Sequence, residues 1–277
     1  QMKYAFWVFI GINVTILLSQ LDQQFVIYFL GAETAGYYAN YLSLVLSFTV
    51  ITGPIFSYLF PLTTELIEKK QHDKIIVLKN VLYKYFSLFA LSVSGLFLVL
   101  GPVISTILFG QKFTYSGQLL SYSGAFLIFY VLFSINFGFL AGMGKVKARA
   151  KIIFIALITN IVLNLIFIQV WGVIGAVAAM MISWIMLCCM SYREIDKDKE
   201  ISFDRRYLIK NLISIGILSA TIYYIKNKVF ILEDIHRYEN LFYFIIICIG
   251  YYICIAGINY KSIVLMKKEF SAIRKSR

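Results

Sequence analysis

Residues 152–192 read IIFIALITNIVLNLIFIQVWGVIGAVAAMMISWIMLCCMSY and contain no charged side chain. A helix needs about 20 residues to cross the roughly 30 Å hydrocarbon layer of a membrane, and this run holds about twice that number. The segment WGVIG at residues 171–175 lies near its middle, and its two glycines favour a turn. The stretch therefore predicts two membrane-spanning helices joined by a tight turn.

Similar apolar runs recur along the whole chain. Of its 277 residues, 60% are hydrophobic and 14% are charged, and the mean hydropathy is +0.80. Soluble domains hold about 45–50% apolar and about 25% charged residues, so this composition excludes a soluble domain. The predicted spans cover residues 4–30, 36–61, 81–100, 116–141, 152–170, 174–192, 207–225 and 241–260. We therefore expect an all-α, polytopic membrane protein with eight transmembrane helices.

The basic residues are unevenly distributed between the two faces that these eight spans define. Four of the 26 Lys and Arg residues fall on one face: Lys112, Lys226, Lys228 and Arg237. The other 22 fall in the terminal segments and in the loops of the opposite face. Because basic loops stay on the cytoplasmic side, both termini of the chain are predicted to be cytoplasmic. The same placement accounts for most of the net charge of +12, through topology and attraction to anionic membrane lipids.

Other classes of site find little support in the sequence. A nucleic-acid-binding surface would gather its basic residues on one folded face, whereas here they are spread over five short segments. The four cysteines fall inside predicted spans, and no Cys or His pair has the spacing of zinc ligands. We therefore expect no nucleic-acid partner, no disulfide and no resident metal. The chain opens with Gln1 rather than Met, and we expect it to be a piece of a longer protein.

Polar residues inside the first predicted span are the strongest functional signal. Asp22 is a carboxylate well inside a span, where an ionised carboxylate costs about 2.5–3.5 kcal/mol at the bilayer centre. Gln20, Gln23 and Gln24 accompany it, so polar side chains occupy two sides of this helix. We therefore predict that the helix borders an aqueous cavity. The alternative is a buried, neutral Asp22 that is hydrogen-bonded to a neighbouring helix.

Further amides lie within the later spans, at Asn40, Asn136, Asn160 and Asn164. Asn160 and Asn164 stand four residues apart and so share one helix face. That face suits either hydrogen bonds between helices or a cavity wall, and we favour the hydrogen bonds.

Two prolines interrupt the second predicted span. Pro54, which follows Gly53, and Pro61 each lack the N–H that a helix needs, and their rings clash with the preceding turn. We expect both to kink or end the helix. Broken helices often provide hinges in transporters.

Several short segments, in a consistent order, resemble the second half of a polysaccharide or O-antigen flippase of the multidrug/oligosaccharidyl-lipid/polysaccharide exporter superfamily. They are QLD at residues 20–22, FLG at 29–31, AGY at 35–37, FPL at 60–62, ILFG at 107–110, GMGK at 142–145, and WGVIGAVA at 171–178, preceded by Asn160 and Asn164.

The resemblance implies that residues 1–192 form a C-terminal six-helix transport lobe. Residues 193–277 would then hold a cytoplasmic loop, two additional spans and a basic tail. In this family two lobes enclose a cavity and rock to move a lipid-linked glycan between leaflets, so the expected partner is the missing N-terminal lobe. The expected location is the bacterial cytoplasmic membrane.

The resemblance also implies a cargo and roles for the residues singled out above. The cargo would be an undecaprenyl-pyrophosphate-linked oligosaccharide for surface polymer synthesis, with a polysaccharide polymerase as a further partner. The polar residues of the spans would line the cavity and bind sugar hydroxyls or a coupling Na⁺ or H⁺, while Pro54 and Pro61 would act as hinges. No Arg or Lys lies deep in a span, so basic residues at the cytoplasmic mouth, Lys84, Lys145 and Arg149, are the candidates to neutralise the pyrophosphate.

Two other functions stay open. A cation-coupled multidrug exporter of the same superfamily would also use an intramembrane carboxylate, and its cargo could stack on the abundant Tyr and Phe residues. A membrane-embedded polysaccharide polymerase or transferase would need a general acid or base, and His72 and Asp73 lie in a charged loop that is more typical of a solvated connection. We therefore expect no enzymatic activity.

Overall fold

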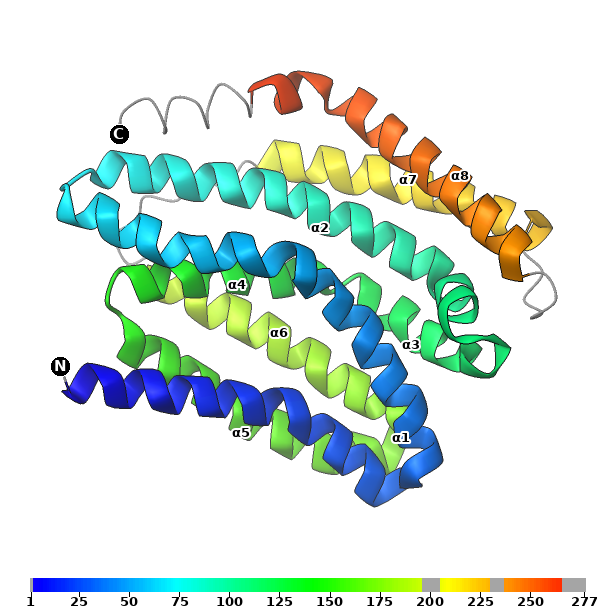
Figure 1. Ribbon diagram of the computed structural model, residues 1–277, viewed down its shortest axis with the longest axis horizontal. Coiled ribbons are helices and arrows are strands. Elements are labelled where there is room, and N and C mark those ends of the chain that lie inside the picture. Colours follow the sequence, from blue (N-terminus) through cyan, green and yellow to red (C-terminus); the bar gives the residue numbers. More distant parts are fainter. Residues whose placement is uncertain (1, 196–204, 230–236, 266–277) are drawn as a thin grey trace. The chain divides into compact units, whose positions relative to one another are not determined.

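The computed structural model describes residues 2–195, 205–229 and 237–265. Throughout these ranges the chain is helical or in short turns, which confirms the all-α prediction (Figure 1). The helices are α1 (Met2–Glu68), α2 (His72–Phe109), η1 (Gln111–Phe113), α3 (Thr114–Gly124), α4 (Leu127–Gly142), α5 (Val146–Trp171), α6 (Val173–Ile195), α7 (Arg205–Val229) and α8 (Arg237–Ile258). Seven of the basic residues assigned to the cytoplasmic face lie outside the described residues: Lys197, Lys199, Lys267, Lys268, Arg274, Lys275 and Arg277.

Several of the described helices have the length and composition of membrane spans. Five can cross a membrane, and the count rises to seven if each of two bent helix pairs is taken as one span. The chain is therefore a multi-pass membrane protein. The count of eight spans and the cytoplasmic location of both termini stay predictions.

The α1 helix contains the first two predicted spans. At Gly31 the backbone leaves the helical region with φ of +84°, a conformation that glycine adopts without steric cost. The chain turns back there, as the two blue arms of α1 in Figure 1 show. Farther along, the segments Gln20–Phe48 and Thr52–Glu68 meet at a bend of 50°. This bend precedes Pro54, whose missing N–H leaves the carbonyl of residue 50 without its helical donor. Pro61 does not end the helix, which continues to Glu68.

Two other predictions of helix boundaries have different outcomes. The turn expected at residues 171–175 is confirmed, because α5 ends at Trp171 and α6 begins at Val173, with Gly172 at φ of +59° between them. The span predicted over residues 116–141 is not one continuous helix, because the chain breaks into α3 and α4 between Gly124 and Leu127 and bends there by 64°; that the pair forms one span stays a prediction. Serines and glycine are weak helix formers, and Ser121 and Ser123 both direct their hydroxyls to backbone carbonyls here.

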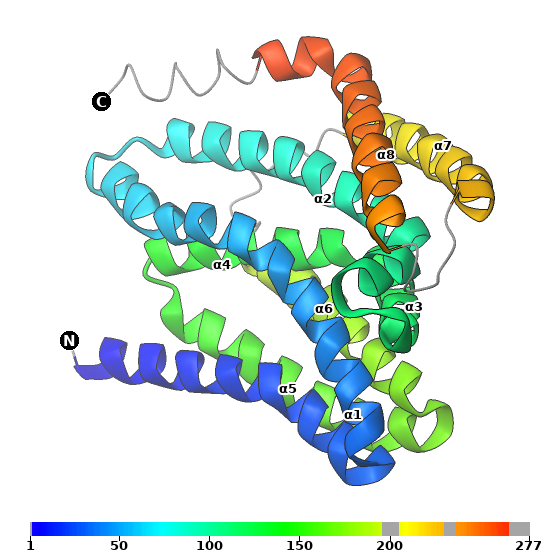
Figure 2. The same cartoon turned by 45° about the vertical axis from the view of Figure 1, so that its right-hand side comes forward.

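The chain packs into two compact units. Unit 1 comprises the described residues of 1–69 and 129–199, and unit 2 those of 70–128 and 200–277. In unit 1, α5 packs extensively against both α1 and α6, and Figures 1 and 2 both show α1 alongside α5. The predicted division at residue 192 into a six-helix lobe and an appended part stays a prediction.

Unit 2 is built around α2, which packs against α3, α7 and α8. Its core contains the buried side chains Leu88, Leu91, Leu96, Val99, Leu100, Val103, Ile107, Tyr207, Ile215, Ile222, Tyr251 and Ile255. Gly101 of α2 and Gly117 of α3 allow a backbone approach so close that a Cβ on either would overlap the carbonyl oxygen of the other. Small residues permit such contacts between helices in membranes.

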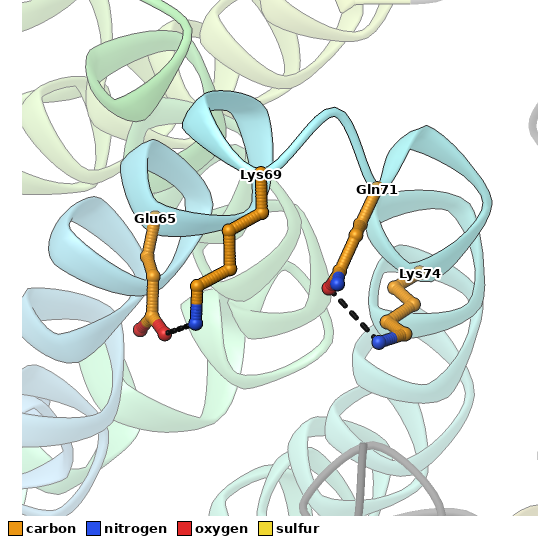
Figure 3. A network of polar contacts seen from close by, with 4 residues as sticks. All are labelled: Glu65, Lys69, Gln71 and Lys74. Carbon is orange, nitrogen blue, oxygen red and sulfur yellow. Dashed lines mark hydrogen bonds and ion pairs between the residues drawn. The ribbon is translucent and has the colours of Figure 1, made fainter. Parts of the chain in front are cut away.

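The turn that links α1 and α2 carries polar contacts on either side (Figure 3). Lys69 forms an ion pair with Glu65 at 2.8 Å, and Lys74 donates a hydrogen bond to the Oε1 atom of Gln71 at 2.9 Å. Both side chains of the ion pair are exposed, at 46% and 37%, and such surface pairs contribute about 0–1 kcal/mol. The ion pair therefore contributes little to stability.

Candidate functional site

Unit 1 contains a cavity of about 900 Å³. Helices α1, α4, α5 and α6 all contribute side chains to its wall. Its polar lining residues include Gln20, Asp22, Gln23, Arg149 and Asn160, and its aromatic ones include Tyr130, Phe133, Phe137 and Trp184. A volume in this range is typical of sites for small molecules or for part of a larger ligand.

A buried polar cluster is centred on Asp22, which is 4% exposed. The Nδ2 atom of Asn164 donates a hydrogen bond to the Oδ1 atom of Asp22 at 2.7 Å, and the Tyr38 hydroxyl donates a longer one to the Oδ2 atom at 3.4 Å. Asn164 also donates to the side-chain oxygen of Asn160 at 3.1 Å. The cluster therefore joins the two arms of α1 to α5 through side chains in the protein interior.

Local structure explains how these residues meet. Asn160 and Asn164 are one helical turn apart on α5, so both face α1. Gly31 lies between Asp22 and Tyr38, and the reversal there brings the second arm of α1 back to the level of the carboxylate. Asp22 is hydrogen-bonded to a neighbouring helix and is also among the residues that line the cavity, and the neutral state of its carboxyl group stays a prediction.

A row of aromatic rings forms one wall of the cavity. Tyr130, Phe133 and Phe137 occupy one face of α4, at positions i, i+3 and i+7. The ring centroids of Tyr130 and Phe133 are 5.2 Å apart, and those of Phe133 and Phe137 are 5.4 Å apart. Trp184 of α6 extends the row, with its ring 5.4 Å from that of Tyr130 in an edge-to-face arrangement.

Arg149 continues this row beyond Phe137. Its guanidinium carbon lies 5.3 Å from the centroid of the Phe137 ring, which is a cation–π distance. Arg149 is half-buried, and of the described residues that line the cavity it is the one with a basic side chain. The wall thus presents a carboxylate with amides, a row of aromatic rings and a guanidinium.

The other residues singled out in the sequence lie elsewhere. Gln24 is exposed, and Asn40 is half-buried; neither is among the lining residues. Asn136 is fully buried and donates a hydrogen bond to the Ser191 hydroxyl at 2.9 Å, which ties α4 to α6.

The two other basic candidates are not among the lining residues either. Lys145 donates a hydrogen bond to the backbone carbonyl of Glu194 at 3.4 Å. Lys84 belongs to unit 2, where its Nζ atom lies 5.1 Å from the centroid of the Tyr207 ring. Pro54 and Pro61 lie within α1 and are not among the lining residues.

Sequence reasoning missed the aromatic wall and Tyr38. The spacing of Tyr130, Phe133 and Phe137 is visible in the sequence as a stripe on one helix face. In a protein with 17% aromatic residues such a stripe is equally typical of lipid-facing and buried surfaces. Tyr38 offers no comparable signal, because its role depends on the reversal at Gly31.

Comparison with known proteins assigns the chain to a family. The family described as Lipid II flippase MurJ matches residues 2–247, which is most of the chain. The chain belongs to the MurJ lipid II flippase family. The sequence motifs predicted a flippase family, and that part of the expectation is confirmed, whereas the polysaccharide or O-antigen cargo stays a prediction.

Individual relatives of this MurJ-family chain are distant. An uncharacterized membrane protein of Methanocaldococcus jannaschii, MJ1068, is 26% identical over 225 residues, which cover 78% of this chain and 43% of the relative. The chain therefore spans less than half the length of that relative.

Two solved structures share the fold. One, described as "Lipid II flippase MurJ, inward closed conformation", has a TM-score of 0.65 at 19% identity, covering 90% of this chain and 53% of that one. The other is a transporter of the MOP superfamily from Pyrococcus furiosus, and its binding pocket is described as having reverse polarity. Its TM-score is 0.62 at 16% identity, covering 82% of this chain and 53% of that one.

Proposed function

We propose that this chain is part of a membrane transporter that flips a polyprenyl-diphosphate-linked oligosaccharide across the bacterial cytoplasmic membrane. The observation that carries the proposal is the cavity of unit 1, in which the Asp22 cluster and the aromatic wall face one space. The family to which the chain belongs supports it, since its described activity is flipping of lipid II.

The lining residues suit a saccharide. Sugar hydroxyls both donate and accept hydrogen bonds, and the Asp22 carboxylate together with the Gln20 and Gln23 amides offers both kinds of partner. The apolar faces of sugar rings pack on aromatic rings such as Tyr130 and Trp184. Flipping moves the cargo without breaking a covalent bond, so the proposal assigns no enzymatic step to these residues.

We also propose that the Asp22 cluster binds a coupling cation, either Na⁺ or H⁺. Hard cations prefer carboxylate and amide oxygens, and Asp22 lies next to the amides of Asn160 and Asn164. Rotation of the Asn164 amide by half a turn would present its oxygen to a cation in place of its Nδ2 donor. Among the described residues no three Asp, Glu, His or Cys side chains gather, so amide oxygens would have to complete the site.

The finer identity of the cargo and of the partners belongs to the same proposal. The glycan would be a precursor of a surface polysaccharide such as O-antigen or capsule, delivered to a polysaccharide polymerase. The remainder of the cavity would come from the rest of the protein, because the chain spans about half the length of the MurJ structure.

The proposal is tested in cells that depend on the complete protein. Asp22→Asn keeps the size of the side chain but removes its charge, and it should reduce surface polysaccharide severalfold at unchanged membrane abundance. Glu33→Gln is the matched control, because Glu33 is an exposed carboxylate of the same helix that does not line the cavity. Unchanged polymer in the Asp22→Asn strain would remove the basis of the proposal. Loss of peptidoglycan precursor export instead of surface polymer would identify lipid II as the cargo.

The aromatic wall also favours a second candidate, a cation-coupled multidrug exporter. Planar cationic drugs stack on rings such as Phe133 and Phe137, and Asp22 would supply a counter-charge. A deletion strain that gains sensitivity to such drugs while its surface polymers are unchanged would favour this function over flipping.

A further inference from the structure

We infer that unit 2 binds the phosphate headgroup of an anionic phospholipid of the bilayer, at the end of its core where Lys84 and Lys210 lie beside two buried amides, Asn211 and Asn259. All four residues belong to unit 2, and none of them lines the cavity of unit 1. The inference is therefore independent of the proposed function, because its ligand is a lipid that stays in the bilayer and is not transported.

Side-chain contacts place the two lysines at one end of unit 2. The Nζ atom of Lys84, on α2, lies 5.1 Å from the centroid of the Tyr207 ring, on α7. Lys210 lies less than one turn farther along α7 and donates a hydrogen bond of 2.9 Å to the backbone carbonyl of Ile258, at the end of α8. The two ammonium groups therefore lie where α2, α7 and α8 come together.

The two amides directly follow, in the chain, the two residues that this hydrogen bond joins. Asn211 is 1% exposed, and neither its Oδ1 nor its Nδ2 atom has a hydrogen-bond partner among the described residues. Asn259 is 2% exposed; its Nδ2 atom donates to the carbonyl of Ile255, and its Oδ1 atom has no partner in the described part of the chain. The amides stand four positions after the core residues Tyr207 and Ile255, so each continues a helix face that packs inside unit 2. Unpaired buried amides cost free energy, and a ligand that supplies their partners would offset that cost.

The donors and acceptors at this end suit a phosphate group that has hydroxyls beside it. The Lys84 ammonium lies against the rings of Tyr85 and Tyr207, and among the described residues neither Lys84 nor Lys210 forms an ion pair with a carboxylate. An ammonium group has three N–H donors, of which Lys210 directs one to a backbone carbonyl. The Nδ2 atom of Asn211 can donate to phosphate oxygens, and amide oxygens accept from hydroxyls. A phosphatidylglycerol headgroup carries both kinds of group.

The surroundings favour a lipid over a soluble phosphate compound. The predicted spans begin at residues 81 and 207 and end at residue 260, so both lysines lie at a predicted boundary of the membrane. Anionic headgroups gather at that level and attract Lys side chains. Nearby on α7, the side chains of Ile209, Leu212 and Ile213 are apolar and exposed, as expected for a helix surface in contact with lipid.

The test measures lipid binding to the purified complete protein in nanodiscs of phosphatidylcholine. The probes are spin-labelled phosphatidylglycerol, spin-labelled phosphatidylcholine and inorganic phosphate, and the immobilised fraction of each labelled lipid reports its binding. The parent should bind phosphatidylglycerol more tightly than phosphatidylcholine. The double variant Lys84→Met/Lys210→Met should weaken phosphatidylglycerol binding roughly tenfold, as expected for the loss of charged hydrogen bonds, and should leave phosphatidylcholine binding unchanged.

Two further variants make the test specific. Lys151→Met removes an exposed positive charge from unit 1 and should bind all probes as the parent does. Asn211→Leu replaces the unpaired amide with an apolar side chain of similar size. Its thermal midpoint in phosphatidylcholine alone should equal or exceed that of the parent, whereas its gain in midpoint on addition of phosphatidylglycerol should be smaller. A merely structural amide would instead lower the midpoint equally in both lipids.

Several results would overturn the inference. One is a parent protein that binds phosphatidylglycerol no more tightly than phosphatidylcholine. Others are phosphatidylglycerol binding by the double lysine variant within about twofold of the parent, an equal loss in Lys151→Met, and an equal fall of the Asn211→Leu midpoint in both lipids. Displacement of the labelled lipid by inorganic phosphate would identify a soluble phosphate compound as the ligand instead. Because the readouts are lipid binding and thermal midpoint, failure of the proposed function would leave the inference standing.

Discussion

The hydrogen bond between Asn164 and Asp22 predicts a strong energetic coupling between α5 and α1. The Nδ2 and Oδ1 atoms are 2.7 Å apart, and the two side chains are 0% and 4% exposed. Replacing Asn164 with Leu removes the donor and leaves the carboxylate oxygen without its closest partner. Replacing Asp22 with Leu removes the acceptor, and the double variant removes both groups.

The expected magnitude follows from the environment of this bond. Hydrogen bonds between neutral side chains of membrane helices average about 0.6 kcal/mol and reach about 1.7 kcal/mol. Bonds to a charged group contribute about 1.5–3 kcal/mol. Because this bond is short and buried, we expect Asn164→Leu to lower the free energy of unfolding by about 2 kcal/mol. The free energy of unfolding should fall much less in the double variant than the sum of the decreases in the two single variants, which corresponds to a coupling energy of about 1–2 kcal/mol between the two side chains.

The assay is reversible unfolding of the complete protein in bicelles, measured for the parent, both single variants and the double variant. Gln169→Leu is the control, because Gln169 is an exposed amide on the same helix. It should change the free energy of unfolding by less than about 0.5 kcal/mol. A coupling below about 0.5 kcal/mol between the Asn164 and Asp22 variants would refute the reasoning, since it would mean that the two side chains act independently.

Two further predictions concern packing and the second partner of Asp22. Tyr38→Phe removes the longer hydrogen bond to Asp22, at 3.4 Å, and in the same assay it should lower the free energy of unfolding by about 1 kcal/mol or less. A decrease as large as that of Asn164→Leu would contradict a weaker contribution of Tyr38. Gly101→Ala places a Cβ atom against the Gly117 carbonyl and should lower the free energy of unfolding by about 1–3 kcal/mol. The Cβ atom of Gly216→Ala has no atom within 4 Å, so this variant should leave the stability unchanged or raise it. Equal abundance and equal thermal midpoints for these two alanine variants would show that the close helix contact is absent.

Much of the fold follows from the sequence because a membrane span is a local property. The uncharged run at 152–192 and the glycines at its centre suffice to place α5, the turn and α6. The break between α3 and α4 is less visible, since the apolar run continues through residues 124–127 and only weak helix formers mark the position. A hydropathy profile detects the apolar run but not the break between α3 and α4.

The candidate site was predictable in part. Asp22 is conspicuous as a carboxylate inside a span, and the spacing of Asn160 and Asn164 places them on one face. Their meeting is a tertiary contact between residues 142 positions apart, which no local pattern encodes. The association of α7 and α8 with α2 in unit 2 has the same origin, because hydropathy shows that a helix is apolar but not which neighbour it packs against.

The central claim is that the cavity of unit 1 carries a lipid-linked saccharide and that Asp22 takes part in its movement. The most direct measurement is flipping of a fluorescent polyprenyl-diphosphate oligosaccharide by the complete protein in proteoliposomes, with an inward cation gradient. We predict that the parent and Glu33→Gln flip the probe at similar rates and that Asp22→Asn flips it at least tenfold more slowly. Equal rates for the parent and Asp22→Asn, or no flipping by the parent under any gradient, would contradict the account.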